Sequence, residues 1–255
     1  MIKFIRSDTE KAQTAIKVLQ AAKLGDRGYN KPEVNEALIE MFRGKCYICE
    51  NKDSISSYQI EHLKPHRGDL ELKYDWNNLF WACGHCNNIK NARYEPILDC
   101  SQVEVDKKIA FRKEGFFGKQ EKFVFIPLED NEETNNTVAL LHDAYYGSTP
   151  QKKIEATNIR KSLRRELSSF KNLIREYEEA EEYDKEDLKC AIRREVKDNS
   201  AFTAFKRWIL WDNKEKLQTR TKVKYDGYNE EIKCLQQVHI KKSSTTSDVL
   251  KIWKS

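Results

Sequence analysis

Two close pairs of cysteines have the spacing of a metal site. Four of the seven cysteines form these pairs, Cys46 with Cys49 and Cys83 with Cys86. Each pair can present two thiolates to one ion from a tight turn, and two pairs complete the tetrahedral all-thiolate coordination of structural zinc. We therefore expect a closed Zn²⁺ site that holds the fold and takes no direct part in chemistry. The other three cysteines are interpreted as unreactive thiols.

The residues between the two pairs have the types that phosphodiester hydrolysis needs. That reaction requires an activated water and a cation that stabilises the charge on the phosphate and the leaving oxygen. An imidazole titrates near neutrality, so His62 is the candidate general base, with His66 the only other histidine nearby. Glu61 offers a hard carboxylate oxygen and Asn87 an amide oxygen to Mg²⁺ or a similar ion. Asn78 could hydrogen-bond the loop that carries His62 and fix its ring.

The order of these residues resembles the HNH endonuclease pattern. An acid–His pair is expected to close a strand, an asparagine stands five residues before the third cysteine, and an asparagine follows the fourth. The resemblance covers residues 46–90 and implies a ββα-metal fold that uses Mg²⁺ or Mn²⁺ for catalysis. By the same resemblance, Glu61 and Asn87 would be ligands of that ion, His62 the general base and Asn78 the residue that orients it.

Two positions depart from the commonest form of the pattern. The acid is Glu61 where many HNH sites have Asp, and the last position is Asn87 rather than His, as in the HNH domain of the CRISPR effector nuclease. Adjacent residues of a strand face opposite ways, so Glu61 and His62 share a site only if the strand ends or bends there. Alternatively, His66 replaces Glu61 as a ligand.

Several polar residues near the motif have less specific interpretations. His85 lies inside the second cysteine pair, and we expect it at the surface because four thiolates already complete a zinc site. Four cations are candidates for phosphate contacts, although each alone is more often a plain surface charge: Lys64, Arg67, Lys90 and Arg93.

The elements that position these residues divide the chain into five parts. We predict an α+β, mostly helical fold, in which a ββα-metal core with a four-cysteine zinc knuckle is flanked by helices on both sides. The parts are an N-terminal helical lead-in (1–45), the HNH core (46–98), a strand-containing connector (99–148), a C-terminal helical region (149–213) and a C-terminal tail (214–255).

The helices are predicted from caps and apolar spacing. A capping box from Ser7 to Glu10 begins a helix that continues to about Lys23, and Asn30 is the expected cap of the next. Residues 130–136 are polar and are interpreted as a linker. One apolar stripe indicates a long helix in the C-terminal half: Ile159, Leu163, Leu167, Phe170, Ile174 and Tyr177. Further helices at about 185–197 and 200–211 complete an expected small bundle.

Charge is distributed unevenly along the chain, which has a net charge of +5. Residues 151–176 hold eight Lys or Arg against three Glu, whereas residues 46–95 hold six basic and seven acidic side chains. A phosphate-binding surface is therefore expected on the C-terminal helices rather than on the core. The simpler interpretation is that these cations line solvated helix faces.

The sequence also indicates a compartment and excludes some functions. No secretory signal or apolar run of about 20 residues occurs, so a cytoplasmic protein without membrane contact is expected. An odd number of cysteines makes a disulfide framework improbable. The chain has no phosphate-cradling loop for ATP, so any ATP dependence must come from a partner.

Beyond the motif, the chain is similar to the PtuB family, the HNH subunits of Septu anti-phage defence systems, which also occur beside some retrons. This resemblance implies an effector nuclease acting on DNA, or on RNA such as tRNA. It implies control by a PtuA-type ABC ATPase and, beside a retron, association with the reverse transcriptase and its RNA–DNA product. The alternative is a zinc-stabilised module that binds nucleic acid or protein without cutting.

Overall fold

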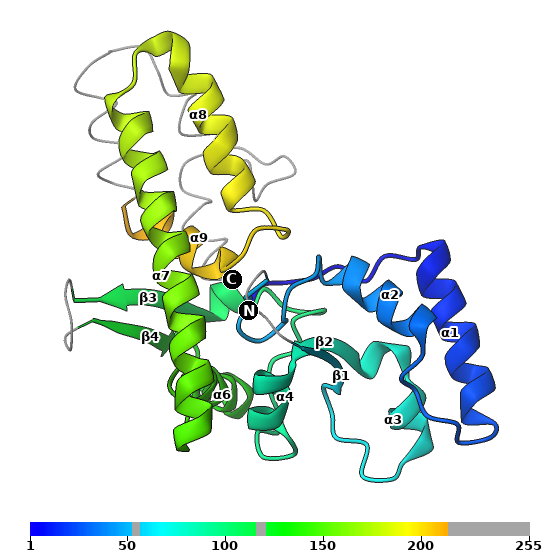
Figure 1. The fold of residues 1–255 in the computed structure, drawn as a ribbon. Coiled ribbons are helices and arrows are strands. Elements are labelled where there is room, and N and C mark those ends of the chain that lie inside the picture. Colours follow the sequence, from blue (N-terminus) through cyan, green and yellow to red (C-terminus); the bar gives the residue numbers. More distant parts are fainter. Residues whose placement is uncertain (53–56, 116–120, 214–255) are drawn as a thin grey trace.

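Helices dominate the computed structural model, which describes residues 1–52, 57–115 and 121–213. This part of the chain forms nine α-helices, one short 3-10 helix and two separate two-stranded antiparallel sheets (Figure 1). The predicted α+β, mostly helical class is thereby confirmed. The predicted tail at 214–255 lies outside the described residues.

The N-terminal lead-in consists of two packed helices, α1 (Glu10–Lys23) and α2 (Pro32–Met41). The cap of α1 differs from the expected one, because the Thr9 side chain, rather than Ser7, accepts from the backbone amide of Ala12. Helix α2 begins with Pro32 in its first turn, as expected. However, its N-cap is Lys31, and the Asn30 side chain instead bonds Asn35.

The ββα unit follows the first cysteine pair. Strand β1 (Tyr58–His62) pairs with β2 (Leu79–Cys83), with His62 opposite Leu79 at one end and Tyr58 opposite Cys83 at the other. The short helix α3 (Leu70–Tyr74) and the 3-10 helix η1 (Trp76–Asn78) connect the strands. Strand β2 ends at Cys83 and leads directly into α4 (Gly84–Lys90), whose first turn carries Cys86.

The connector contains the expected strands and two helices that were not predicted from the sequence. After α5 (Val105–Lys108), strands β3 (Ile109–Glu114) and β4 (Lys122–Pro127) form the second sheet. The segment interpreted as a polar linker instead begins α6 (Glu132–Tyr146), because the Asn131 side chain caps the backbone amide of Thr134. The buried residues Leu140, Leu141 and Tyr145 then give this helix its apolar face.

The C-terminal region is a long helical hairpin with a third helix at its base. Helices α7 (Pro150–Glu179) and α8 (Glu182–Glu195) project from the rest of the molecule as an arm (Figure 1). A small apolar cluster of their own holds them together: Phe170, Tyr177, Ile192 and Val196. Helix α9 (Thr203–Asp212) joins the main core, where Phe205 packs against Phe111 and Phe125 of the second sheet. No described helix has the length and apolarity to cross a bilayer.

Arg6 attaches the N-terminal segment to the ββα unit. Its guanidinium donates to the backbone carbonyl oxygens of Trp76 (3.0 Å), Asn77 (3.0 Å) and Leu79 (2.9 Å). The same group lies 4.7 Å from the ring centre of Phe80. The planar guanidinium of arginine has several N–H donors in fixed directions, so it can bond three carbonyls better than the ammonium group of lysine can. Arg6 therefore fixes the segment that leads directly into β2.

We predict that Arg6→Met lowers the free energy of unfolding by roughly 2 kcal/mol, because three carbonyls, two of them in partly buried hydrogen bonds, lose a charged donor. Urea unfolding followed by circular dichroism measures the change. Lys3→Met is the matched control, since Lys3 is an exposed cation on the same segment. Equal midpoints for the two variants would show that the Arg6 contacts contribute nothing to stability.

Candidate active site and metal centre

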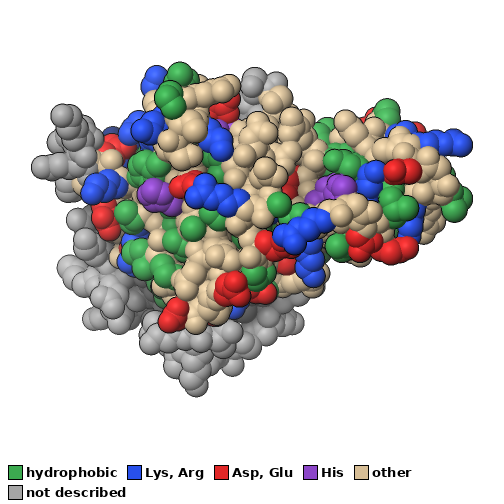
Figure 2. Space-filling view, turned by 90° about the horizontal axis from the view of Figure 1, so that it is seen from below, with side chains coloured by type: hydrophobic (Ala, Val, Ile, Leu, Met, Phe, Trp, Pro, Cys, Tyr) green, Lys and Arg blue, Asp and Glu red, His purple; other side chains and the backbone are tan. Residues whose placement is uncertain are grey.

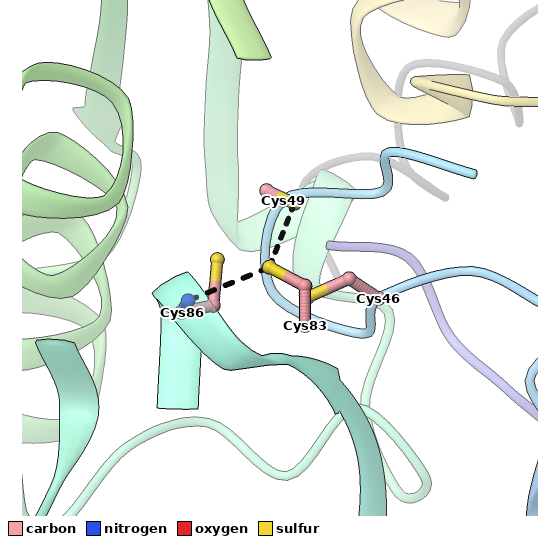
Figure 3. Close-up of side chains that lie close together, drawn as sticks. All are labelled: Cys46, Cys49, Cys83 and Cys86. Carbon is pink, nitrogen blue, oxygen red and sulfur yellow. Dashed lines mark hydrogen bonds between the residues drawn. The ribbon is translucent and has the colours of Figure 1, made fainter. Parts of the chain in front are cut away.

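The two cysteine pairs converge on one point between the loop before β1 and the first turn of α4 (Figure 3). All four thiols are buried, and their sulfur atoms lie within 4.8 Å of one another, with 4.0 Å between Cys49 and Cys83. Zn–S bonds of about 2.3 Å in a tetrahedron place neighbouring sulfurs about 3.8 Å apart. The geometry thus fits one metal ion, and these four cysteines could bind it.

The electrostatics of the cluster also call for a cation. Burial raises the pKa of the Cys49 and Cys86 thiols well above their usual range, because a thiolate there would be desolvated beside other sulfurs. A divalent ion reverses this preference and holds all four groups as thiolates. Among the remaining cysteines, Cys100 is buried and Cys190 half-buried, and Cys234 lies outside the described residues.

His85 is not at the surface, so that expectation is wrong. Its side chain is buried, with Nε2 2.8 Å from the carbonyl oxygen of Ala144 on α6 and Nδ1 3.0 Å from a carboxylate oxygen of Glu155 on α7. The ring therefore joins the second cysteine turn to the two helices that cover it. Nothing in the local spacing predicts this, because both partners are distant in sequence.

His62 closes β1 and is 9% exposed. Its Nε2 lies 3.0 Å from the backbone carbonyl oxygen of Lys73 on α3. Because a carbonyl oxygen only accepts, Nε2 carries the proton, and Nδ1 keeps its lone pair. Burial lowers the pKa of His62 from its ordinary value, and the positive charge of Lys90 lowers it further, against the opposing bond to Lys73. The ring is therefore neutral at neutral pH, and its Nδ1 can accept a proton.

Asn78 holds two segments that contact this histidine, the loop that follows it and α3. Its side-chain oxygen accepts from the amide of Lys64 (2.8 Å), and its side-chain nitrogen donates to the carbonyls of Lys64 (2.9 Å) and Leu72 (3.0 Å). Its backbone carbonyl also accepts from the amide of Leu63. Asn78 thereby joins the loop directly after His62 to α3, whose Lys73 carbonyl binds the imidazole.

Glu61 has a different set of neighbours. One carboxylate oxygen lies 2.6 Å from Nζ of Lys90, and the other accepts from the Tyr47 hydroxyl at 2.6 Å. Burial raises the pKa of Glu61, although the adjacent Lys90 ammonium opposes that rise. Lys90 also donates to the backbone carbonyl of His62 at 2.8 Å. As strand alternation requires, Glu61 and His62 point to opposite faces of β1.

Asn87 lies on the first turn of α4, on the Glu61 side of the strand. Its amide nitrogen donates to the side-chain oxygen of Gln59 at 2.6 Å. Within the described part of the chain, no donor is bonded to its amide oxygen, so that oxygen is available to another group. Asn87 is half-buried, whereas both oxygens of Glu61 are buried and already bonded.

His66 lies beside His62, with 4.8 Å between their ring centres. The ring is half-buried, and its Nδ1 accepts from the amide of Gly68 at 3.2 Å. The structure therefore brings His66 close to the candidate base, while Glu61 and Asn87 lie on the other side of β1. Of the two ligand sets considered from the sequence, Glu61 and Asn87 share one side of the strand, whereas His66 and Asn87 do not.

Three of the four candidate phosphate contacts are exposed. Arg67 and Arg93 form surface ion pairs with Glu95 and Asp143, and Lys64 is also exposed. Lys90 corrects the expectation, because its ammonium is fully buried against Glu61 and does not reach a phosphate from there. Figure 2 shows basic and acidic side chains mixed around the histidines of one face, with no large patch of one sign.

Two residues at the site were missed from the sequence. Tyr47 lies inside the first cysteine pair and donates to Glu61, and Tyr29 lies between α1 and α2 with its ring centre 4.6 Å from that of His62. Neither follows a motif spacing. Tyr47 alone had a signal in the sequence, because it lies between the candidate metal ligands Cys46 and Cys49.

Comparisons with known proteins agree with this geometry. Residues 46–93 match the HNH endonuclease family. The Septu protein PtuB of Bacillus mycoides is 34% identical over 27% of this chain and 28% of its own length. The Septu protein PtuB of Bacillus thuringiensis is 35% identical over 29% of this chain and 31% of its own length. The match thus spans less than a third of these relatives. Residues 46–93 are therefore similar to the HNH endonuclease family, and part of the chain resembles the PtuB proteins.

Proposed function

We propose that the chain is a metal-dependent endonuclease that hydrolyses phosphodiester bonds, with DNA the first substrate and RNA, including tRNA, the second. One observation carries this proposal. His62 presents an unprotonated Nδ1, because its Nε2 is bound to the Lys73 carbonyl, and Asn78 fixes the loop around it. A neutral imidazole held in one orientation is what a general base requires.

The proposed steps follow from these contacts. Nδ1 of His62 takes a proton from the water that attacks the phosphorus. The imidazolium that forms keeps its bond from Nε2 to the Lys73 carbonyl, which stabilises the new positive charge. Asn78 bonds α3, which carries the Lys73 carbonyl, and the loop at residues 63–64, which follows His62. It thereby keeps the carbonyl positioned against the imidazole.

Asn87 and Glu61 would hold a catalytic Mg²⁺ or Mn²⁺ on one side of β1, and the alternative ligand His66 lies on the other side, beside His62. The amide oxygen of Asn87 is available, whereas Glu61 can bind an ion only by exchanging its bond to Lys90. The fit is therefore partial in this arrangement, and Glu61 is the weakest of the three ligands. When bound, the ion stabilises charge on the phosphate and the leaving oxygen.

The four cysteines are proposed to bind a separate, structural Zn²⁺ ion. Four thiolates leave no open position for water or substrate, so this ion holds Cys46 and Cys49 against the start of α4. The two metals thus have different tasks, and removal of zinc would affect cleavage only through the fold.

The similarity to Septu proteins supports a place in cytoplasmic anti-phage defence, with a PtuA-type ABC ATPase as the controlling partner. A retron reverse transcriptase with its RNA–DNA product is the second partner to test. Copurification from cells that express the neighbouring genes distinguishes the two.

A zinc-stabilised binding module without cleavage is the alternative function. The buried Glu61–Lys90 pair favours it, since the pair occupies a carboxylate that a catalytic ion would use. Incubation of the purified protein with plasmid and tRNA, with Mg²⁺ or Mn²⁺, separates the two proposals. Retained binding without cutting, alone and with an ATPase partner, would support the module.

We predict that His62→Ala lowers the cleavage rate by about a hundredfold or more, because a positioned general base contributes about 10²–10⁴-fold. Zinc content should stay that of the parent, and circular dichroism should show that the variant is folded. His142→Ala is the control, because His142 is an exposed histidine on α6 that stacks on Tyr146 and lies close to Asp143, away from His62 in the sequence. A His62→Ala protein that cuts at the parental rate would refute the assignment.

The pH dependence of cleavage should show the lowered pKa of His62. The base is active when neutral, so activity is retained above that pKa and falls as the pH drops through it. We therefore expect the acid limb of kcat/KM below the ordinary histidine value of 6.5. Initial rates in overlapping buffers at constant ionic strength measure it. An acid limb above 6.5 would contradict the burial argument.

Removal of one thiolate should cost both metal and stability. We predict that Cys83→Ser reduces bound zinc from about one ion per chain and lowers the thermal midpoint, because metal binding and folding are coupled. Elemental analysis and thermal unfolding give the two readouts. Cys190→Ser, which changes a half-buried thiol on α8, should leave both unchanged. Full zinc content in Cys83→Ser would exclude the four-thiolate site.

A further inference from the structure

The loop between α1 and α2 reaches the candidate base although the family match begins only after it. Tyr29 on this loop places its ring centre 4.6 Å from that of His62, with the two planes at 89°. Perpendicular aromatic pairs at such distances are favourable, since the edge of one ring meets the electron-rich face of the other. The contact therefore restrains the imidazole from the side of the N-terminal lead-in.

The loop is anchored to the helix that binds His62. The amide of Gly28 donates to the Tyr74 hydroxyl at 3.2 Å, and that hydroxyl donates to Asp26 at 2.7 Å. Asp26 also forms an ion pair with Lys73. Lys73 is the residue whose carbonyl accepts from Nε2 of His62. The ring contact and the carbonyl contact thus come from two segments that are bonded to each other.

We propose that Tyr29 is a positioning residue for His62, so that the N-terminal lead-in completes the active site. The proposal rests on the proposed function, in which Nδ1 of His62 must face the water. Rotation of the imidazole about its second side-chain torsion would move Nδ1 away and break the Nε2 bond. A perpendicular ring pair biases such an orientation by roughly twofold to tenfold.

The aromatic ring, rather than the hydroxyl, carries this role. Among the described residues no hydrogen bond involves the Tyr29 hydroxyl, whereas the ring meets His62 directly. Tyr29→Phe therefore keeps the interaction, and Tyr29→Leu keeps apolar bulk but removes the ring. Tyr183→Leu on α8 is a matched control, because that tyrosine is 82% exposed and lies on the projecting arm.

The first test is independent of cleavage. With ¹⁵N-labelled histidine, the His62 ring signals are identified by their loss in His62→Ala and compared at one fixed pH above 6.5. The parent and Tyr29→Phe should show a single tautomer with the proton on Nε2, and Tyr29→Leu a mixture. A single Nε2–H tautomer in Tyr29→Leu would overturn the proposal. Circular dichroism and zinc content confirm that each variant is folded.

The second test measures cleavage. Tyr29→Leu should lower kcat about tenfold with KM within about twofold, because misplacement of the base affects the chemical step and not binding. Tyr29→Phe should restore the rate to within about twofold of the parent. A raised KM with unchanged kcat would overturn the proposal, since Tyr29 would then contact substrate. If the parent cuts nothing, the proposed function fails, and the tautomer measurement still decides the role of Tyr29.

Discussion

Four buried thiols converge at one point and join the loop before β1 to the junction of β2 and α4. Cys46 and Cys49 precede β1, while Cys83 ends β2 and Cys86 lies in the first turn of α4. Such a cluster is costly without a cation, because each thiolate would be desolvated beside its neighbours. Residues next to these cysteines connect the cluster to the covering helices. The Tyr145 hydroxyl donates to the Cys49 carbonyl at 2.8 Å, and His85 contacts α6 and α7. The strands can hold His62 in place only while this junction is closed.

Alternation along β1 divides the site into two sides. His62 faces Lys73 and Tyr29, and Glu61 faces Tyr47 and Lys90. Removal of one member of a buried ion pair is strongly destabilising, so the Glu61–Lys90 pair is a firm part of the fold. It also makes that side of the site electrically neutral. Under the proposed function, affinity for nucleic acid would come from exposed cations beyond it, on the neighbouring loops and the C-terminal helices.

Features that depend on the spacing of nearby residues could be predicted from the sequence. Cysteine pairs, the apolar stripe of α7 and the expected strands of the connector all appear where the pattern places them. The position of Asn78 relative to the cysteines indicated an orienting role, and its three side-chain bonds suit that role. By contrast, the burial of His85 and the pairing of Lys90 depend on segments far apart in the chain. Such contacts leave no periodic signal.

The segment that matches the HNH family, residues 46–93, is shorter than the folded region that contacts it. Arg6 bonds three carbonyls at the entry to β2, and Tyr29 packs against His62, and both residues precede the matched segment. On the other side, the amide of Phe202 donates to the carbonyl of Glu50 and places α9 against the first cysteine loop. Each contact fills a position that would otherwise expose apolar surface or an unpaired carbonyl. The flanking segments therefore contribute directly to the surroundings of His62, although they lie outside residues 46–93.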